Sequence, residues 1–191
     1  MNRRDEHGRT PLMNCALVDD ERWAVGLART LLEHSARSGP RDRLGFTALH
    51  YACVYHRPAL VRVLVAADFD VRATDRRGNT PLHYAVATGD CVVSALLLSA
   101  YRRHQLPVDA VNRHGQSALA FACHNAQSDC ARLIRDATTS AAVNAKSSSE
   151  PQSPLKHLGT TRARVSAVTH TGTYIRDFRS VAHSVRHSQI C

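Results

Sequence analysis

The sequence has few aromatic residues and no long apolar run. Aromatic residues make up 5% of the 191 residues, whereas all hydrophobic residues together make up 43%. The core must therefore consist mainly of Leu, Val and Ala, which favours closely packed helices over an aromatic-rich β-sandwich. The longest apolar stretch, Cys91–Ala100, is interrupted by Ser94 and Ser99. It falls far short of the ~20 residues that a membrane-spanning helix requires.

Secretory and disulfide signals are also lacking. The first ten residues, MNRRDEHGRT, are polar and include acids, unlike a secretory signal. The six cysteines form no C-x-x-C pair, and without a secretory signal we expect them to be reduced thiols. These observations predict an intracellular protein, cytoplasmic and/or nuclear.

Motifs for catalysis, cofactors and metals are absent from the sequence. It has no G-x-x-x-x-G-K-[ST], no G-x-S-x-G, no H-E-x-x-H and no paired Cys/His spacing typical of zinc sites. We therefore expect no enzyme, cofactor, metal site or small-molecule substrate. The net charge of +9 is modest for this length; it is compatible with an acidic partner but does not by itself indicate nucleic acid.

Four similar segments recur along the chain. Their Thr or Ser residues are Thr10, Thr47, Thr80 and Ser117, separated by 37, 33 and 37 residues. The segments read DEHGRTPLMNCA, DRLGFTALHYAC, DRRGNTPLHYAV and NRHGQSALAFAC. An apolar run typical of a second helix follows each: Leu27–Leu32, Leu60–Val65, Val93–Leu98 and Cys130–Ile134.

The chemistry of each position fits a turn followed by a helix. Asp-x-x-Gly favours a tight turn, because Asp bonds its own backbone and Gly accepts positive φ. The Thr or Ser that follows suits a helix N-cap, and Pro11 and Pro81 suit the first helical position. The small residues at the end of each segment, including Cys15, Cys53 and Cys123, let two helices approach closely, so we expect these thiols to be buried.

The pattern resembles the ankyrin repeat, a 33-residue unit carrying T-P-L-H-x-A, over roughly residues 5–136. The resemblance implies an all-α solenoid of helix-turn-helix units joined by β-hairpin-like loops. The expected repeats span about 5–41, 42–74, 75–111 and 112–136. We place one four-residue insertion in the helix–helix loop around residues 18–22. We place the other at residues 101–106, extending the second helix or the following loop.

The resemblance also assigns roles to several residues. His56 and Asp68 stand where the family usually has Gly, and Asp can adopt the left-handed conformation. His50 and His83 are expected to hydrogen-bond between adjacent repeats. Tyr51, Tyr84 and Phe121 are expected in the core rather than forming a ladder that stacks nucleic-acid bases.

Family partners usually dock on the loop tips and on the exposed end of the first helix. Mapped onto this sequence, the predicted partner-binding residues are Arg43, Leu44, Phe46, Val54, Tyr55, Arg76, Arg77, Asn79, Arg113 and His114. We expect a row of arginines beside an exposed apolar centre of Leu44, Phe46, Val54 and Tyr55. Such a composition suits an acidic or amphipathic segment of another protein, the alternative being that these tips are solvated loops.

Composition changes in the last part of the chain. Residues 137–191 contain sixteen Ser/Thr, seven Lys/Arg and two acids, which predicts a disordered basic tail. The segment SAVTHTGTYIRDF could order on a partner. Ser166, in R-A-R-V-S, and Ser153, before Pro154, are candidate phosphorylation sites, the alternative being a solvated tail without modification.

Three functional hypotheses follow. The first is a non-enzymatic adaptor or scaffold that binds a protein segment through its concave loop-tip surface. The second is a nucleic-acid-binding protein, against which the fourteen acids within residues 1–136 argue mildly. The third is a regulatory fragment of a larger enzyme.

Overall fold

The computed structural model describes residues 3–34 and 39–146, and within them it is helical without strands. The inner helices are short, and α1 is followed by a single 3₁₀ turn, η1. These elements are α1 (Pro11–Asn14), η1 (Cys15–Leu17), α3 (Ala48–Val54), α5 (Pro81–Ala87) and α7 (Ala118–His124). The outer helices are α2 (Glu21–Glu33), α4 (Pro58–Ala66), α6 (Cys91–Arg103) and α8 (Ser128–Lys146). The expected all-α class is confirmed.

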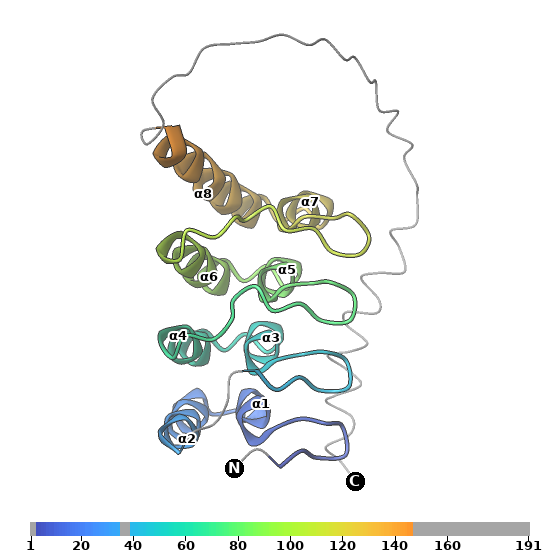
Figure 1. Cartoon of the computed structure of the whole chain (residues 1–191), viewed down its shortest axis with the longest axis vertical. Helices are drawn as coiled ribbons and strands as arrows, with labels where there is room; N and C mark the ends of the chain where they lie inside the picture. The colour runs from blue at the N-terminus through green and yellow to red at the C-terminus, as the bar shows by residue number, and fades with distance from the viewer. Residues whose placement is uncertain (1–2, 35–38, 147–191) are drawn as a thin grey trace. The chain divides into compact units, whose positions relative to one another are not determined.

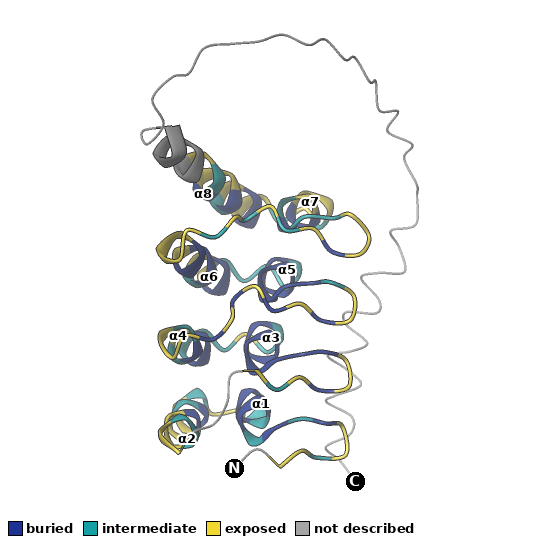
Figure 2. Ribbon diagram, in the orientation of Figure 1, coloured by how far each residue is buried: buried dark blue, intermediate teal, exposed yellow. Residues whose placement is uncertain are grey.

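The helices form four stacked pairs in two layers. In Figure 1 the inner helices lie beside the long loops and the outer helices form the opposite side. Each inner helix packs on the next inner helix, and α4 and α6 likewise pack on the outer helices that flank them. One pair cannot bury its apolar face alone, so stacking creates a continuous core between the layers, where Figure 2 shows the buried residues. The expected solenoid is confirmed.

Buried histidines connect consecutive repeats. Nδ1 of His50 accepts a hydrogen bond from the backbone N–H of Thr47 at 3.2 Å, and its Nε2 lies 3.2 Å from the carbonyl oxygen of Asn79 in the next repeat. His83 repeats the arrangement, with Nε2 3.1 Å from the Gln116 carbonyl oxygen. Both rings are buried, so the expected role between adjacent repeats is confirmed.

The two four-residue insertions have the same structural form. α2 and α6 each contain 13 residues, whereas α4 contains 9. The extension of the third repeat by its second helix is confirmed, because α6 reaches Arg103. The insertion predicted around residues 18–22 was misplaced: α2 starts at Glu21, in the same register as α4 and α6, and ends one turn later than α4. Four residues complete about one helical turn, so the insertion lengthens the helix without rotating its buried face.

Left-handed residues end the helices at recurring positions. His56, Gly89 and Ala126 connect an inner to an outer helix with φ of 53°, 72° and 54°. Asp68 and Gln105, which follow outer helices, have φ of 58° and 52°. The expectation that Asp68 replaces a left-handed Gly is confirmed. Residues other than Gly adopt this conformation at an energetic cost.

Two expectations about the ends of elements require correction. The repeat region was expected to end at residue 136, but α8 continues to Lys146. Its composition supports this, since residues 137–146 include four alanines and no Gly or Pro. Cys123 was expected to be buried but is exposed, because α7 is the last inner helix among the described residues and no further helix pair among them covers that side. Residues 147–191, with the candidate phosphorylation sites Ser153 and Ser166, lie outside the described residues.

None of the helices in the described part of the chain is long and apolar enough to cross a membrane.

Tyr51, Tyr84 and Phe121 lie in the core as predicted, each at most 6% exposed. Cys15 and Cys53 are also buried as expected, and burial raises the pKa of the Cys15 thiol to about 11. These residues are therefore part of the packed interior.

Replacing Ala126 by Gly should stabilise the protein. The left-handed backbone at this position strains an alanine but not a glycine, which outweighs the larger entropy of glycine in the unfolded chain. We expect Ala126→Gly to raise the free energy of unfolding by roughly 0.5–1 kcal/mol, measured by urea denaturation. Ala120→Gly, inside helix α7 of the same repeat, is the matched control and should lower it by about 1 kcal/mol. Destabilisation by both substitutions would contradict the assignment of strain.

Stability should fall as the pH drops from about 6.5 to about 4. Burial lowers the pKa of His50 to about 4, below the value of about 6.5 expected in the unfolded chain. The unfolded chain therefore binds more protons in this interval, and the stability present above pH 6.5 is progressively lost. We expect a loss of roughly 2–3 kcal/mol from this group, measured by denaturant titrations across the interval.

The variant His50→Gln removes this titrating group and should show a smaller slope of stability against pH than the wild-type chain. His124→Gln, which changes an exposed histidine and leaves His50 in place, is the control and should retain most of the wild-type slope. Equal slopes for His50→Gln and the wild-type chain would contradict the role of His50.

Candidate partner-binding surface

Three of the four loops turn around one buried polar side chain. Oδ1 of Asp42 accepts hydrogen bonds from the backbone N–H groups of Leu44 and Phe46, at 2.9 and 2.7 Å. Asp75 and Asn112 make the equivalent pairs of bonds in the next two loops. These bonds tighten the turn, so the residues directly after Asp42, Asp75 and Asn112 project from the loop tip.

Backbone hydrogen bonds join each loop tip to the next. The N–H of Arg43 donates to the His7 carbonyl at 3.4 Å, that of Arg76 to Leu44 at 3.1 Å and that of Arg113 to Arg77 at 3.0 Å. The contact is close: a Cβ added to Gly45 would lie 2.8 Å from the backbone nitrogen of Arg76. The tips therefore form one continuous strip rather than four independent loops.

Exposed arginines lie along this strip. We call the following residues the arginine row: Arg43, Arg76, Arg77 and Arg113. All four are exposed, as is His114 beside the last of them. Arg43, Arg76 and Arg113 occupy the same position in successive loops and are the donors of the bonds that join the tips. Guanidinium groups are suited to bidentate hydrogen bonds with carboxylates.

The apolar centre predicted beside the row is smaller than expected. Phe46 is 5% exposed, so its prediction as a surface residue was wrong. Its ring stacks on His50 at a centroid distance of 5.4 Å and meets Tyr84 edge-on at 5.0 Å, in the interior. Leu44 is 49% exposed, as expected for a surface residue at the loop tip. Phe46 is instead buried because it faces the inner helices of two repeats.

Val54 and Tyr55 lie at the other end of α3 and are half-buried. The ring of Tyr55 stacks on Tyr51 with centroids 6.3 Å apart. Only part of each side chain can therefore contact a partner. Leu44 thus lies at the tip of the second loop, whereas Val54 and Tyr55 lie at the far end of α3.

Asn79 was predicted to contact a partner, but its side chain is completely buried. Its Oδ1 accepts a hydrogen bond from Nδ2 of Asn112 in the next loop at 2.9 Å, and its Nδ2 donates to the hydroxyl of Tyr84 at 3.5 Å. Asn79 therefore holds two adjacent loops together. This prediction of a surface residue was also wrong.

Two tyrosine–aspartate contacts that were not predicted from the sequence support the loops. The Tyr51 hydroxyl donates to Oδ2 of Asp42 at 2.7 Å, and Tyr84 makes the same contact with Asp75. Burial and the hydrogen-bonded carboxylate raise the pKa of both tyrosines. The signal was present, because Tyr follows Asp at the same spacing in the second and third copies but not in the others.

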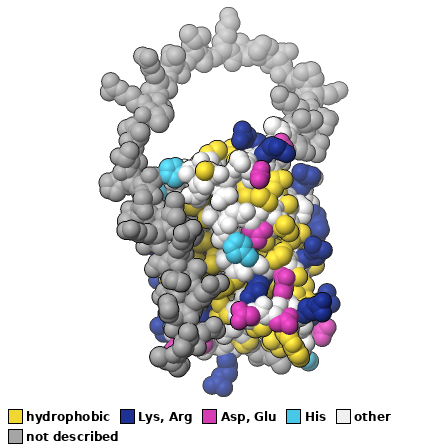
Figure 3. All heavy atoms as spheres, turned by 180° about the vertical axis from the view of Figure 1, so that it is seen from behind, with side chains coloured by type: hydrophobic (Ala, Val, Ile, Leu, Met, Phe, Trp, Pro, Cys, Tyr) yellow, Lys and Arg dark blue, Asp and Glu magenta, His cyan; other side chains and the backbone are white. Residues whose placement is uncertain are grey.

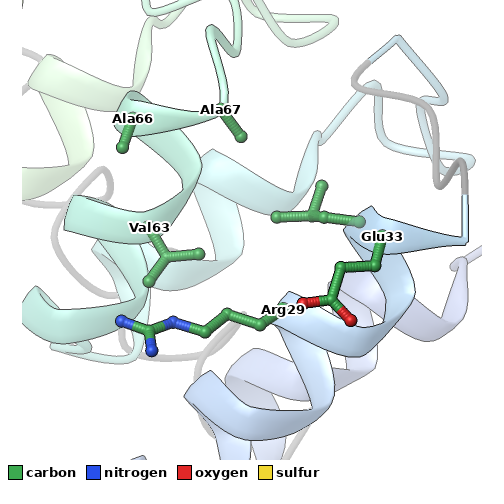
Figure 4. Close-up of a pocket in the computed structure, with 6 residues that line it drawn as sticks. Arg29, Glu33, Val63, Ala66 and Ala67 are labelled. Carbon is green, nitrogen blue, oxygen red and sulfur yellow. The ribbon is translucent and has the colours of Figure 1, made fainter.

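Other surface features lie away from the arginine row. A hollow of about 310 Å³ lies between the outer helices α2 and α4 (Figure 4). Its lining residues are Arg29, Leu32, Glu33, Val63, Ala66 and Ala67. On the face shown in Figure 3, acidic side chains lie between basic ones and hydrophobic side chains reach the surface. The side chains of the described residues include no group of three or more His, Cys, Asp or Glu that could hold a metal ion.

Trp23 and Leu27 on α2 are also exposed, at 69% and 46%. The sequence analysis treated neither as a surface site. Both belong to the first repeat, and among the described residues no helix pair precedes this repeat to cover them. Their exposure follows from that position.

Comparison with known proteins agrees with the repeat architecture. Two family models of ankyrin repeats match overlapping parts of the chain, one with many copies at residues 31–89 and one with three copies at residues 61–147. The human ankyrin repeat domain-containing protein 63 is 35% identical over 156 residues, covering 79% of this chain and 41% of its own length. Its mouse counterpart is 37% identical over 131 residues, covering 69% and 34%.

A more distant match is chicken inversin, 34% identical over 119 residues, or 61% of this chain and 10% of inversin. The chain thus spans less than half the length of these relatives. Family models, relatives and the stacked helix pairs agree. The chain belongs to the ankyrin repeat family.

Proposed function

We propose that this chain is a non-enzymatic adaptor that binds an acidic, amphipathic segment of another protein along the arginine row. Ankyrin repeats are generally protein–protein interaction modules, and the family is typically non-enzymatic. The observation that carries the proposal is the alignment of Arg43, Arg76 and Arg113 by the backbone hydrogen bonds between loop tips. Because the loops are held in register, the charges are preorganised for a partner that follows the strip.

The charge of the row indicates the chemistry of the partner. Four exposed guanidinium groups attract carboxylates, and Arg forms bidentate pairs that define orientation as well as affinity. The turn-forming Asp42 and Asp75 are at most 8% exposed and hydrogen-bonded within their loops, so they are not available to a partner. A segment rich in Asp and Glu would therefore be the best complement.

Apolar contacts would come from fewer residues than the sequence suggested. Leu44, next to Arg43 in the chain, is an exposed apolar residue beside the arginine row. The accessible parts of Val54 and Tyr55 would extend these contacts along α3. A partner with one or two apolar side chains among its acids would match this arrangement, since well-packed apolar anchors dominate binding energy.

Reversing two charges should weaken this binding. We expect Arg76→Glu with Arg77→Glu to weaken binding of acidic peptides at least tenfold, equivalent to about 1.4 kcal/mol, while leaving the fold intact. The measurement is selection of a random peptide library on the immobilised wild-type chain, followed by titration of the selected peptides against both chains. Peptides selected on the wild type should be enriched in Asp and Glu and should bind less tightly at high salt.

The matched control reverses two exposed arginines on outer helices, Arg62→Glu with Arg132→Glu, which gives the same change in net charge. This variant should bind the selected peptides nearly as well as the wild type. Circular dichroism and thermal unfolding check that both variants fold. If both variants lost affinity for the selected peptides equally, the effect of charge would be nonspecific and the assignment of the surface would be overturned. Tight binding of DNA or RNA at physiological salt in a gel shift, without peptide binding, would favour a nucleic-acid function instead.

A further inference from the structure

Two cysteines from neighbouring repeats lie in direct contact. Sγ of Cys91, at the start of α6, is 3.3 Å from Sγ of Cys130, near the start of α8. Cys130 is completely buried, whereas Cys91 is partly exposed. The two sulfurs therefore meet where the third and fourth repeats pack, and Cys91 is the less buried of the two residues.

The equivalent positions at the preceding repeat boundary hold different residues. In the repeat register Pro58 corresponds to Cys91, and Val93 corresponds to Cys130. Pro58 begins α4, and Val93 lies in the first turn of α6. Apolar residues are thus sufficient for packing at this boundary. A facing pair of thiols adds chemistry that packing does not require.

Metal binding is a poor explanation for the pair. Structural zinc sites use four ligands, commonly from Cys and His. Among residues with described side chains, no third His, Cys, Asp or Glu joins the two thiols in a metal-binding group. Two adjacent sulfurs without further ligands are instead suited to forming a bond with each other.

We propose that Cys91 and Cys130 form an oxidisable dithiol, converted by a hydroperoxide to a reversible disulfide that links the third repeat to the fourth. A disulfide requires an S–S distance of ~2.05 Å, so the sulfurs must approach by about 1.2 Å, a shift that side-chain rotation can supply. This inference concerns the outer helices and does not depend on the proposed partner.

The reaction begins at the accessible sulfur. The Cys91 thiolate attacks one oxygen of hydrogen peroxide and breaks the O–O bond, giving a sulfenic acid at Cys91 and hydroxide, which takes up a proton to form water. The sulfur of Cys130 then attacks that of Cys91, forming the S–S bond and breaking the S–O bond. The departing hydroxide takes up the Cys130 proton as water. Overall, two thiols lose two electrons and hydrogen peroxide is reduced to two waters.

The surroundings give the two cysteines different roles. Burial raises the pKa of Cys130 to about 11, and the hydrogen bond to Cys91 and its charge act in the same direction. Cys130 therefore stays largely protonated and hidden from peroxide until the sulfur beside it has been oxidised. This makes Cys91 the residue that meets the oxidant and Cys130 the resolving thiol.

The disulfide would constrain the last repeat. It closes a loop between positions 39 residues apart, which contains α7 and Arg113 of the arginine row. Cross-linking lowers the entropy of the unfolded chain and holds α8 on α6. The fourth repeat, the last one in the described part of the chain, would thereby open less often.

The test uses the full chain with Cys123→Ser and Cys191→Ser. Both substitutions are needed because Cys123 shares a tryptic peptide with Cys130, and Cys191 lies outside the described residues. The reduced protein is treated with hydrogen peroxide and alkylated, and its mass and peptides are analysed without reduction. Before alkylation, we expect the oxidised protein to be about 2 Da lighter than the reduced protein. The digest should contain a cross-linked peptide with Cys91 and Cys130, and dithiothreitol should reverse the cross-link. The melting temperature should rise by roughly 5–10 °C on oxidation.

Adding Cys91→Ser to the same background should abolish the cross-link and the rise in melting temperature, while circular dichroism shows the same helical fold. The proposal is overturned if the folded parent protein oxidises Cys91 to sulfinic acid, or leaves both thiols open to alkylation, without forming the cross-link. It is equally overturned if the cross-link forms only in denaturant.

Discussion

The register between neighbouring loops is the constraint from which the candidate surface follows. At each of three boundaries a backbone N–H, from Arg43, Arg76 or Arg113, donates to a carbonyl of the preceding loop. These bonds require a glycine where the two loops touch, as at Gly45, because a side chain there would collide with the next loop. Buried Asp42 and Asp75, each held by a tyrosine, stiffen the loops from inside. The exposed arginines are thus held in place by a buried network of hydrogen bonds inside the loops.

Much of the fold could be predicted because each repeat carries strong local signals. The N-cap residue, the buried histidine and the apolar runs identified the helix pairs, and His50 and His83 have the roles expected of them. The insertion in the first repeat was harder, because η1 and the following loop resemble an enlarged connection in sequence. Only the register of α2 against α4 shows that the extra turn belongs to the helix.

The surface was predicted less completely because exposure depends on contacts with the next repeat. Phe46 and Asn79 occupy loop positions that often face solvent, yet the following repeat covers both. Leu44 shares the same loop as Phe46 and remains exposed, a difference that arises from the direction of each side chain around the turn. The contact between Cys91 and Cys130 could not be predicted from the sequence either, because 39 residues separate the two cysteines and neither belongs to a recognisable motif.

The longer helices α2 and α6 have a consequence for how this protein can diverge. Their extra turns are accommodated at the ends of outer helices, while the loops retain their register. Changes in the length of the outer helices alter the layer that these helices form without altering the distances between charges on the loops. The outer helices therefore provide a region where insertions can accumulate during evolution while the geometry of the loops is inherited unchanged.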